Sequence, residues 1–431
     1  LKIVDKTPFD CLICSGGDTA LAVFAALGAA ALIPGGELLP GMPYSTVVGG
    51  RAEGIQVFTK SGGFGGPNAL VEAANALFGK QDGRPILGIT MGDPCGIGPE
   101  VIARALERKE CREICRPLVI GSAAAMQKAV EITGAKLAVH PVSNVSEAKF
   151  LPGIMDVLDQ RSVDVSRLEY GAVSKTGGEA AFLAVEEAIR LALAGEIHGT
   201  VTAPLNKEAL NLAGHPYSGH TEIYADLTNT RDYAMVLVHE HFRVIHVTTH
   251  VSLRKACDLC KKERVLKTIR LARAACVELG IESPRIAVAG LNPHAGENGL
   301  FGDEEISEIR PAVEAAQKEG INAEGPLPPD TVFSKAAGGM YDIAVAMYHD
   351  QGHIPMKLAG FKYDEKTGKW SSVSGVNLTV GLPVVRSSVD HGTAFDQAGK
   401  GTASAESMFN AIEYGALLSR GRMKNTTVVS R

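Results

Sequence analysis

The chain has 431 residues, of which 45% are hydrophobic and 21% are charged, and its formal net charge is −5. This composition is typical of a globular protein with two or three domains, and it excludes a disordered or fibrous chain. Lysine and arginine are spread along the sequence without a basic block, so we expect no nucleic-acid partner.

The first predicted unit spans residues 1–80 and is rich in glycine and alanine. It contains two glycine-rich turns, SGGDTA at Ser15–Ala20 and KSGGFGG at Lys60–Gly66, each between a strand-like run and a helical run. Turns of this kind point backbone N–H groups at a helix N-terminus, where phosphate groups bind. Tight turns without a ligand are the alternative, because glycine-rich loops are weak signals. The candidate phosphate-binding residues are Ser15, Gly16, Gly17, Asp18, Thr19, Gly62 and Gly63.

The most apolar run, Thr19–Ile33, is too short to cross a bilayer comfortably. We interpret it as a buried helix and predict a cytoplasmic protein without membrane contact. The cysteines are scattered, and two pairs have Cys-x-x-Cys spacing, Cys11/Cys14 and Cys257/Cys260. A zinc site would need both pairs to converge, so reduced cytosolic thiols are the preferred interpretation.

The polar linker KQDGRP, Lys80–Pro85, precedes a second predicted domain, residues 84–431, in which strands and helices alternate. The predicted strands include Pro117–Gly121, Gly199–Thr202, Ala234–His239, Phe242–Thr248, Arg285–Ala289 and Asp342–Met347. The predicted helices include Glu179–Ala194, Ser252–Leu279 (as two helices) and Glu304–Glu319. This alternation predicts an α/β fold with a largely parallel sheet. No G-x-G-x-x-G fingerprint follows a strand.

Three of the predicted strands lead to a histidine: His250, His294 and His349. The carboxyl ends of neighbouring parallel strands meet at one edge of a sheet, so these imidazoles are able to surround one cation. Three protein ligands leave positions open for a substrate. A structural role is the alternative for each histidine taken alone.

Other residues suit an anionic substrate. SGHTE places His220 and Thr221 near a helix N-terminus, which favours anions. Lys357 follows His349 by one short segment. The segment VNLTVGLPVVRSSVDHGTAFD adds Asn377, Arg386, Asp390 and His391. Basic groups that converge with a helix N-terminus are typical of a site for phosphate and carboxylate.

These motifs resemble a known family. The segments MGDPCGIGPE, TAPLNKEAL, GHTEIYA, TTHVSLR, GLNPHAGE, GPLPPDT, MYHDQGH and VDHGTAFD occur in this order from residue 85 to about 415. Together they resemble the PdxA family, the 4-hydroxythreonine-4-phosphate dehydrogenases of vitamin B6 synthesis. GHTEIYA is more similar to the PdxA2 branch, whose members resemble dehydrogenases of 4-phospho-D-threonate or 4-phospho-D-erythronate.

The resemblance implies a two-subdomain fold with a central cleft, like that of isocitrate and isopropylmalate dehydrogenases. It also implies a homodimer with a shared active site, NAD as cofactor, and oxidative decarboxylation of a small phosphorylated hydroxy acid. The vitamin B6 substrate is the alternative. By motif, the divalent metal (Zn, Mg, Mn or Co) is bound by His250, His294 and His349. The substrate contacts are His220, Thr221, Lys357, Asn377 and Arg386, and the candidate bases are Lys207 and Asp330.

Two segments depart from this family. The segment Phe361–Gly375 is longer than the family's usual link, and we predict a hairpin with Lys366, Thr367 and Gly368 at its tip. Residues 1–80 resemble instead the C-terminal end of the nucleotide-binding domain of four-carbon acid sugar kinases. This second resemblance implies that these candidate residues bind nucleotide, with ATP as a further ligand. A phosphotransferase or a nucleotide-binding regulatory module built on residues 1–80 is therefore an alternative function, and a non-catalytic metal-binding scaffold is another.

Overall fold

The computed structural model describes residues 11–39, 41–60, 83–365, 369–373 and 375–429. The chain divides into two compact units, Leu1–Gly83 and Arg84–Arg431. In the part of the chain that is described, no helix is both long enough and apolar enough to span a bilayer.

The first unit is a small α/β sheet. Its elements are β1 (Cys11–Ser15), α1 (Gly17–Leu27), β2 (Ala31–Leu39), β3 (Met42–Val48), the short turn η1 (Gly50–Ala52) and β4 (Gln56–Lys60). The strand order is β1-β4-β3-β2, in which only β1 and β4 pair in parallel. Helix α1 packs against β1 and β4.

The prediction of one buried helix over Thr19–Ile33 is wrong. Helix α1 ends at Leu27 because Gly28 adopts a left-handed conformation, with φ of 72°, and caps the helix. The chain then enters β2 at Ala31. The apolar run is also not buried throughout, since Leu21 is 70% exposed and Ile33 is 59% exposed.

The second unit is built on a 12-stranded sheet. Its strands are β5 (Ile86–Thr90), β6 (Arg116–Gly121), β7 (Ala138–Val142), β8 (Ile154–Asp159), β9 (Gly199–Thr202), β10 (Ala234–His239), β11 (Phe242–His246), β12 (Ile286–Ala289), β13 (Ala323–Leu327), β14 (Ile343–Ala346), β17 (Val376–Val380) and β18 (Arg386–Val389). Their order is β13-β12-β14-β11-β10-β17-β18-β9-β5-β6-β8-β7. The pairs β11/β10, β10/β17 and β17/β18 are antiparallel and the others are parallel, which confirms the predicted α/β class.

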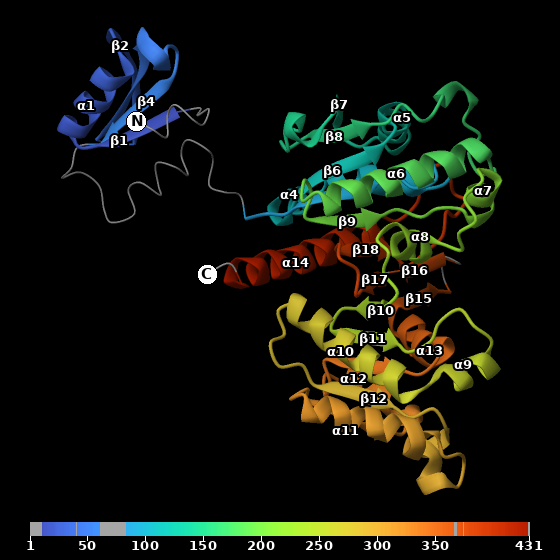
Figure 1. Cartoon of the computed structure of the whole chain (residues 1–431). Helices are drawn as coiled ribbons and strands as arrows, with labels where there is room; N and C mark the ends of the chain where they lie inside the picture. The colour runs from blue at the N-terminus through green and yellow to red at the C-terminus, as the bar shows by residue number, and fades with distance from the viewer. Residues whose placement is uncertain (1–10, 40, 61–82, 366–368, 374, 430–431) are drawn as a thin grey trace. The chain divides into compact units, whose positions relative to one another are not determined.

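Helices cover both faces of this sheet (Figure 1). They are α3 (Gly98–Glu107), α4 (Lys109–Ile114), α5 (Ala123–Thr133), α6 (Lys175–Leu193), α7 (Lys207–Leu212), α8 (His220–Leu227), α9 (Leu253–Leu259), α10 (Lys262–Glu278), α11 (Arg310–Lys318), α12 (Pro329–Ala337), α13 (His349–Gly360) and α14 (Glu406–Val429). Short turns lie at η2 (Val145–Glu147), η3 (Val165–Arg167), η4 (Pro293–Gly299) and η5 (Glu305–Ile309, a π-helical turn).

Strand β12 shows why the parallel strands of this sheet have continuous apolar sequences. Ile286 and Val288 belong to one hydrophobic cluster, and Ala287 and Ala289 belong to another. Alternate residues of a strand face opposite sides of the sheet, so both sides of β12 are buried. Helices α10 and α12 both pack against β12 and β14.

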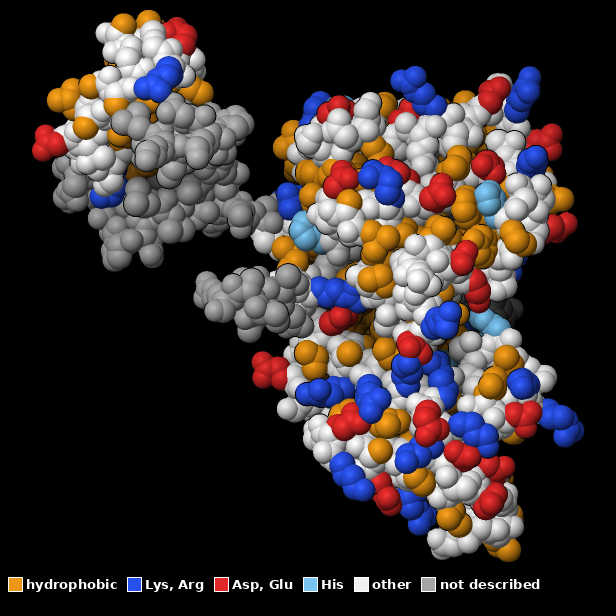
Figure 2. Space-filling model, in the orientation of Figure 1, with side chains coloured by type: hydrophobic (Ala, Val, Ile, Leu, Met, Phe, Trp, Pro, Cys, Tyr) orange, Lys and Arg blue, Asp and Glu red, His pale blue; other side chains and the backbone are white. Residues whose placement is uncertain are grey.

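The antiparallel strands β10, β17 and β18 join the two parallel groups in the middle of the unit (Figure 1). Helix α14 packs on β9, β17 and β18. The predicted hairpin is present as the antiparallel pair β15 (Phe361–Asp364) and β16 (Lys369–Val373). Its predicted tip, residues 366–368, lies outside the described residues. On the face shown in Figure 2, acidic side chains are interspersed among the lysines and arginines of this unit.

Candidate active site

A cavity of about 290 Å³ lies beside the antiparallel strands in the middle of the sheet. It brings together most of the residues that the motifs predicted for the substrate: His220, Thr221, Asn377, Arg386 and the candidate base Lys207. Lys207 is the first residue of α7, and His220 and Thr221 begin α8. Asn377 lies on β17, and Arg386 begins β18. Segments far apart in the sequence therefore build one polar cavity.

Arg386 is a buried cation that forms no ion pair among the described residues. Its side chain is 3% exposed, and its guanidinium donates to the hydroxyls of Thr379 at 2.6 Å, Thr202 at 3.1 Å and Thr221 at 3.2 Å. No described carboxylate forms an ion pair with it, and its Nε has no hydrogen-bond partner among the described residues. Burial lowers the pKa of Arg386 to about 10, so it stays charged at neutral pH. A buried charge that is hydrogen-bonded to hydroxyls and has no ion-pair partner among the described residues favours an anionic ligand.

Three more side chains of the cavity keep a buried polar atom without a partner among the described residues: His220 Nε2, Asn377 Oδ1 and His391 Nε2. Burial, with a smaller effect of Arg386, holds the pKa of His220 well below its usual range. His391 donates from Nδ1 to the carbonyl of Gly392 at 2.9 Å, which leaves its Nε2 as an acceptor in the neutral ring. Buried polar atoms are normally paired, so these atoms are suited to contact a ligand.

His250 and His349 are brought together, as predicted, with ring centroids 5.7 Å apart. His250 lies in the loop after β11, and His349 is the first residue of α13. Both line a second cavity of about 360 Å³. His250 also lines the first cavity, of about 290 Å³, which we call the Arg386 cavity. His349 donates from Nδ1 to Asp350 at 2.7 Å, and a carboxylate on one ring nitrogen is the usual arrangement behind a metal-binding histidine. Burial lowers the pKa of His250, which favours the neutral imidazole that binds metal.

His294 does not join the other two histidines within one chain. It begins a turn in η4, it is exposed, and its Nδ1 lies 3.2 Å from Glu297 Oε2. In the described part of the chain, no three His, Cys, Asp or Glu side chains are arranged to hold a metal ion. The residues present therefore fit a metal in part: two imidazoles converge, and a third is presented elsewhere on the surface.

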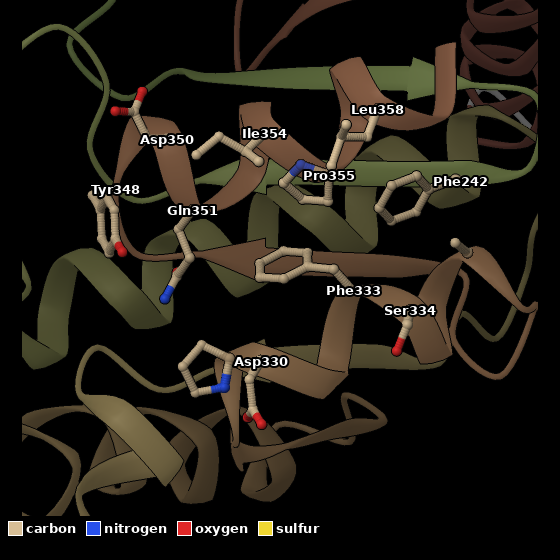
Figure 3. A pocket seen from close by; sticks show the side chains of 12 residues that line it. Phe242, Asp330, Phe333, Ser334, Tyr348, Asp350, Gln351, Ile354, Pro355 and Leu358 are labelled. Atoms are coloured by element: carbon tan, nitrogen blue, oxygen red, sulfur yellow. The ribbon is translucent and has the colours of Figure 1, made fainter. Parts of the chain in front are cut away.

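Asp330 is also separate from the substrate cavity. It lies in the first turn of α12 and lines a third cavity, of about 560 Å³, together with Asp350 and Gln351. Figure 3 shows this cavity between α12 and α13, with Phe333 of α12 pointing into it. Turn η4 packs against α12, so His294 and Asp330 lie on the same side of the second unit.

Lys357, in the last turn of α13, forms an ion pair with Asp390, which lines the Arg386 cavity. Two further residues of this cavity, Glu222 and His353, were not predicted. The ring of His353 stacks on that of His349 at 3.6 Å. The spacing of four residues on α13 was the available signal, because it places both rings on one helix face.

The glycine-rich loop after β5 is packed, and it does not form a phosphate cradle. A Cβ atom at Gly92 would lie 2.4 Å from the carbonyl oxygen of Pro204, and one at Gly98 would lie 2.6 Å from that of Met91. Glycine is needed here for close packing. This loop therefore does not resemble a dinucleotide-binding fingerprint.

The first glycine-rich turn of the N-terminal unit is described and the second is not. Gly16 precedes α1 with φ of 91° and donates its N–H to the carbonyl of Lys60 at 2.8 Å. Asp18 lies in the first turn of α1, where its negative charge would repel a bound phosphate. Gly62 and Gly63 lie outside the described residues. Nucleotide binding by this unit stays a prediction.

Comparison with known proteins agrees with the motifs. The family model described as pyridoxal phosphate biosynthetic protein PdxA matches residues 113–415, and the nucleotide-binding C-terminal domain model matches residues 1–70. A D-threonate 4-phosphate dehydrogenase from Pectobacterium atrosepticum is 48% identical over 329 residues, which are 76% of this chain and 97% of the relative. Its counterpart from Salmonella typhimurium is 49% identical with the same coverage.

The solved structures that resemble this chain lead to the same family. The crystal structure of a 4-hydroxythreonine-4-phosphate dehydrogenase from Klebsiella pneumoniae matches with a TM-score of 0.69 and 46% identity, over 78% of this chain and 99% of that one. The predicted resemblance is thereby confirmed, and the chain belongs to the PdxA family.

Proposed function

We propose that the chain is a dehydrogenase that uses NAD and a divalent metal to oxidise a 4-phosphorylated four-carbon hydroxy acid. The substrate is 4-phospho-D-threonate or 4-phospho-D-erythronate. The observation that carries this proposal is the buried guanidinium of Arg386, which donates to three threonine hydroxyls and forms no ion pair among the described residues. The relatives named D-threonate 4-phosphate dehydrogenase support the same substrate class.

The phosphate of the substrate binds at the Arg386 end of the cavity. Arg386, Thr221 and the first N–H groups of α8 offer it donors, and a helix N-terminus favours an anion. A phosphate oxygen also gives Arg386 Nε the acceptor that it lacks among the described residues. Asn377 and the Lys357–Asp390 pair then orient the rest of the acid.

Lys207 is the best-placed base for the reaction, because it lines the same cavity as Arg386 and His250. It takes the proton of the substrate hydroxyl while the hydride on the same carbon passes to NAD, the hydride acceptor. A divalent cation (Zn, Mg, Mn or Co) at the histidines supplies Lewis-acid chemistry that makes this hydroxyl more acidic. The 3-keto acid then breaks its bond to the carboxylate carbon, releases CO2 and takes up a proton to give dihydroxyacetone phosphate.

We further propose that the active site is shared by two copies of the chain in a homodimer. The candidate residues fall into two groups: His250 and Arg386 line one cavity with His349 close to His250, whereas His294 and Asp330 do not line that cavity. In a dimer, His294 of a second copy completes the metal site of the first. Asp330 of that second copy comes with it and is the second candidate base.

An apolar surface supports this dimer. Ile354 and Leu358 on α13 are 58% and 78% exposed, although both are large hydrophobic residues. They border the cavity of about 560 Å³ between α12 and α13, together with Phe242 and Phe333 (Figure 3). Exposed apolar groups gathered on one surface are typical of an interface.

The alternative substrate is 4-phosphohydroxy-L-threonine, the amino acid of vitamin B6 synthesis. The structural relatives named 4-hydroxythreonine-4-phosphate dehydrogenase support it. The two substrates share the phosphate and the oxidised carbon, so the Arg386 cavity suits both.

The deciding experiment is NADH formation by the purified chain with Mg²⁺, Mn²⁺ or Co²⁺. 4-Phospho-D-threonate, 4-phospho-D-erythronate and 4-phosphohydroxy-L-threonine are offered in parallel, and dihydroxyacetone phosphate is measured. We expect turnover of a sugar-acid phosphate that is lost in the His250→Ala, His294→Ala and His349→Ala variants. Turnover of the amino acid alone would establish the alternative, and no turnover of any substrate would contradict both.

A further inference from the structure

The turn that carries His294 has an unusual backbone. Five consecutive residues, His294–Asn298, have positive φ angles between 46° and 78°, so they form a short left-handed helical turn. Only Gly296 among them is a glycine. The left-handed conformation is unfavourable for the other four residues, because their Cβ atoms crowd the backbone. Such a turn persists only where its surroundings hold it in place.

Glu305 is the side chain that holds this segment. It is 1% exposed and lies in the first position of the π-helical turn η5. Its Oε1 accepts the N–H of Leu291 at 2.7 Å and that of Asn292 at 2.8 Å, and its Oε2 accepts Asn292 Nδ2 at 3.0 Å. No described basic side chain forms an ion pair with Glu305. The loop's own N–H groups therefore replace a counter-ion for this buried carboxyl group.

The loop is also shaped closely around the Glu305 carboxyl group. A Cβ atom at Gly296 would lie 2.6 Å from Glu305 Oε2, and one at Gly290 would lie 3.1 Å from Oε1. The two glycines thus leave the space that the carboxyl group occupies, on the inner side of the loop. His294, on the outer side, is exposed and contacts Glu297.

We propose that Glu305 is a positioning residue for the metal centre: it holds the loop Gly290–Gly302 so that His294 points away from its own chain. This inference rests on the proposed function, since it takes His294 as a metal ligand for a second copy. Glu305 is buried and lines none of the three cavities described above, so it acts only through the loop. Groups behind a metal ligand typically change metal affinity about 10–100-fold when they are replaced.

The test compares Glu305→Gln with Glu308→Gln in the full-length protein. Glu308 is a matched control, because it lies on the same turn η5. It accepts hydrogen bonds from the Lys261 ammonium and the Lys262 N–H, away from the loop. Co²⁺ affinity is measured by titration of its visible absorption, and amide hydrogen exchange is followed at Leu291 and Asn292. We expect about 10–100-fold weaker Co²⁺ binding and faster exchange for Glu305→Gln, and wild-type behaviour for Glu308→Gln. Unchanged Co²⁺ affinity in a folded Glu305→Gln protein would overturn the inference.

Two further variants keep the outcome interpretable. His294→Ala tests the proposed function itself: if it leaves Co²⁺ affinity unchanged, His294 is not a ligand and both ideas fail. If His294→Ala weakens binding and Glu305→Gln does not, only the positioning role fails. Should Glu305→Gln not fold, Glu305→Asp decides, because the shorter side chain keeps the charge but withdraws the carboxyl group from the N–H groups of Leu291 and Asn292, and it should weaken Co²⁺ binding in the same direction.

Discussion

The guanidinium of Arg386 donates to the hydroxyl of Thr221 across 3.2 Å, which links the start of β18 to the first turn of α8. The two residues are 165 positions apart in the sequence. This contact holds a buried positive charge at the N-terminus of a helix, and two effects that favour an anion therefore coincide.

The first prediction concerns this charge. Arg386→Lys keeps one positive charge and removes the planar fork that reaches three hydroxyls. We expect KM for the phosphorylated substrate to rise roughly 100-fold, or about 3 kcal/mol, with a smaller change in kcat. The measurement is steady-state kinetics, with inorganic phosphate as a competing inhibitor of the wild type.

The matched control is Arg264→Lys. Arg264 is also partly buried, and among the described residues it donates to the carbonyls of Val247 and Tyr233. This variant should lose some stability and keep its KM. A wild-type KM in the Arg386→Lys protein would show that the phosphate binds elsewhere.

The second prediction tests the shared site. Arg386→Ala disrupts the substrate cavity, and His294→Ala removes the histidine that we propose binds the metal of the second copy. Each variant alone should therefore be inactive. In a mixture of subunits, half of the dimers carry both changes, and each of these dimers keeps one intact site. Co-expression should therefore restore about a quarter of the wild-type activity. If His294 acts in its own chain, the mixture stays inactive.

The third prediction concerns the apolar surface on α13. Leu358→Asp places a charge on a residue that is 78% exposed, so it should not disturb the fold of one chain. It should prevent dimer formation, because an uncompensated charge within an interface is unfavourable. Light scattering should show a monomer, and NADH formation should be lost with it.

Leu193→Asp is the control for that surface. Leu193 ends α6 and is 53% exposed, on the other parallel half of the sheet. It should leave the dimer intact. A dimer that persists in Leu358→Asp would assign the interface to another surface.

The sequence was sufficient for much of the sheet because apolar runs such as Ile343–Ala346 are buried on both faces. The three histidine-bearing strands are indeed neighbours, in the order β12-β14-β11. The helix start at His220 was also predictable from its local polar turn. These features depend on short segments and on general rules of parallel sheets.

Other features depend on contacts between distant residues. His294 departs from the other histidines because Glu305, beyond the loop, holds a left-handed turn that no local propensity favours. The predicted helix Glu304–Glu319 likewise begins with the π-helical turn Glu305–Ile309 before α11. At Gly28 the reason is local, since a glycine inside an apolar run ended the helix that we predicted to continue.

The last prediction concerns Asp93, a buried carboxyl group in the loop after β5. Its Oδ1 accepts the N–H of Cys95 at 2.9 Å, and its Oδ2 has no partner among the described residues. Burial, opposed by the hydrogen bonds from Cys95, raises the pKa of Asp93 from 3.8 to about 6. The folded state therefore binds this proton more tightly than the unfolded state. The resulting stability is fully present below pH 3.8 and is lost as the pH rises through about 6.

Asp93→Asn imitates the protonated form at every pH, so its stability relative to the wild type should increase between pH 4 and pH 7.5 by about 3 kcal/mol. Urea unfolding of both proteins across this range measures the difference. Asp164→Asn is the control with the opposite sign, because hydrogen bonds from Ser166 hold the pKa of Asp164 below its usual value. That variant should be less stable than the wild type at neutral pH and approach it in acid. A pH-independent difference for Asp93→Asn would mean that Asp93 finds a partner or a water molecule that keeps it ionised in the folded protein.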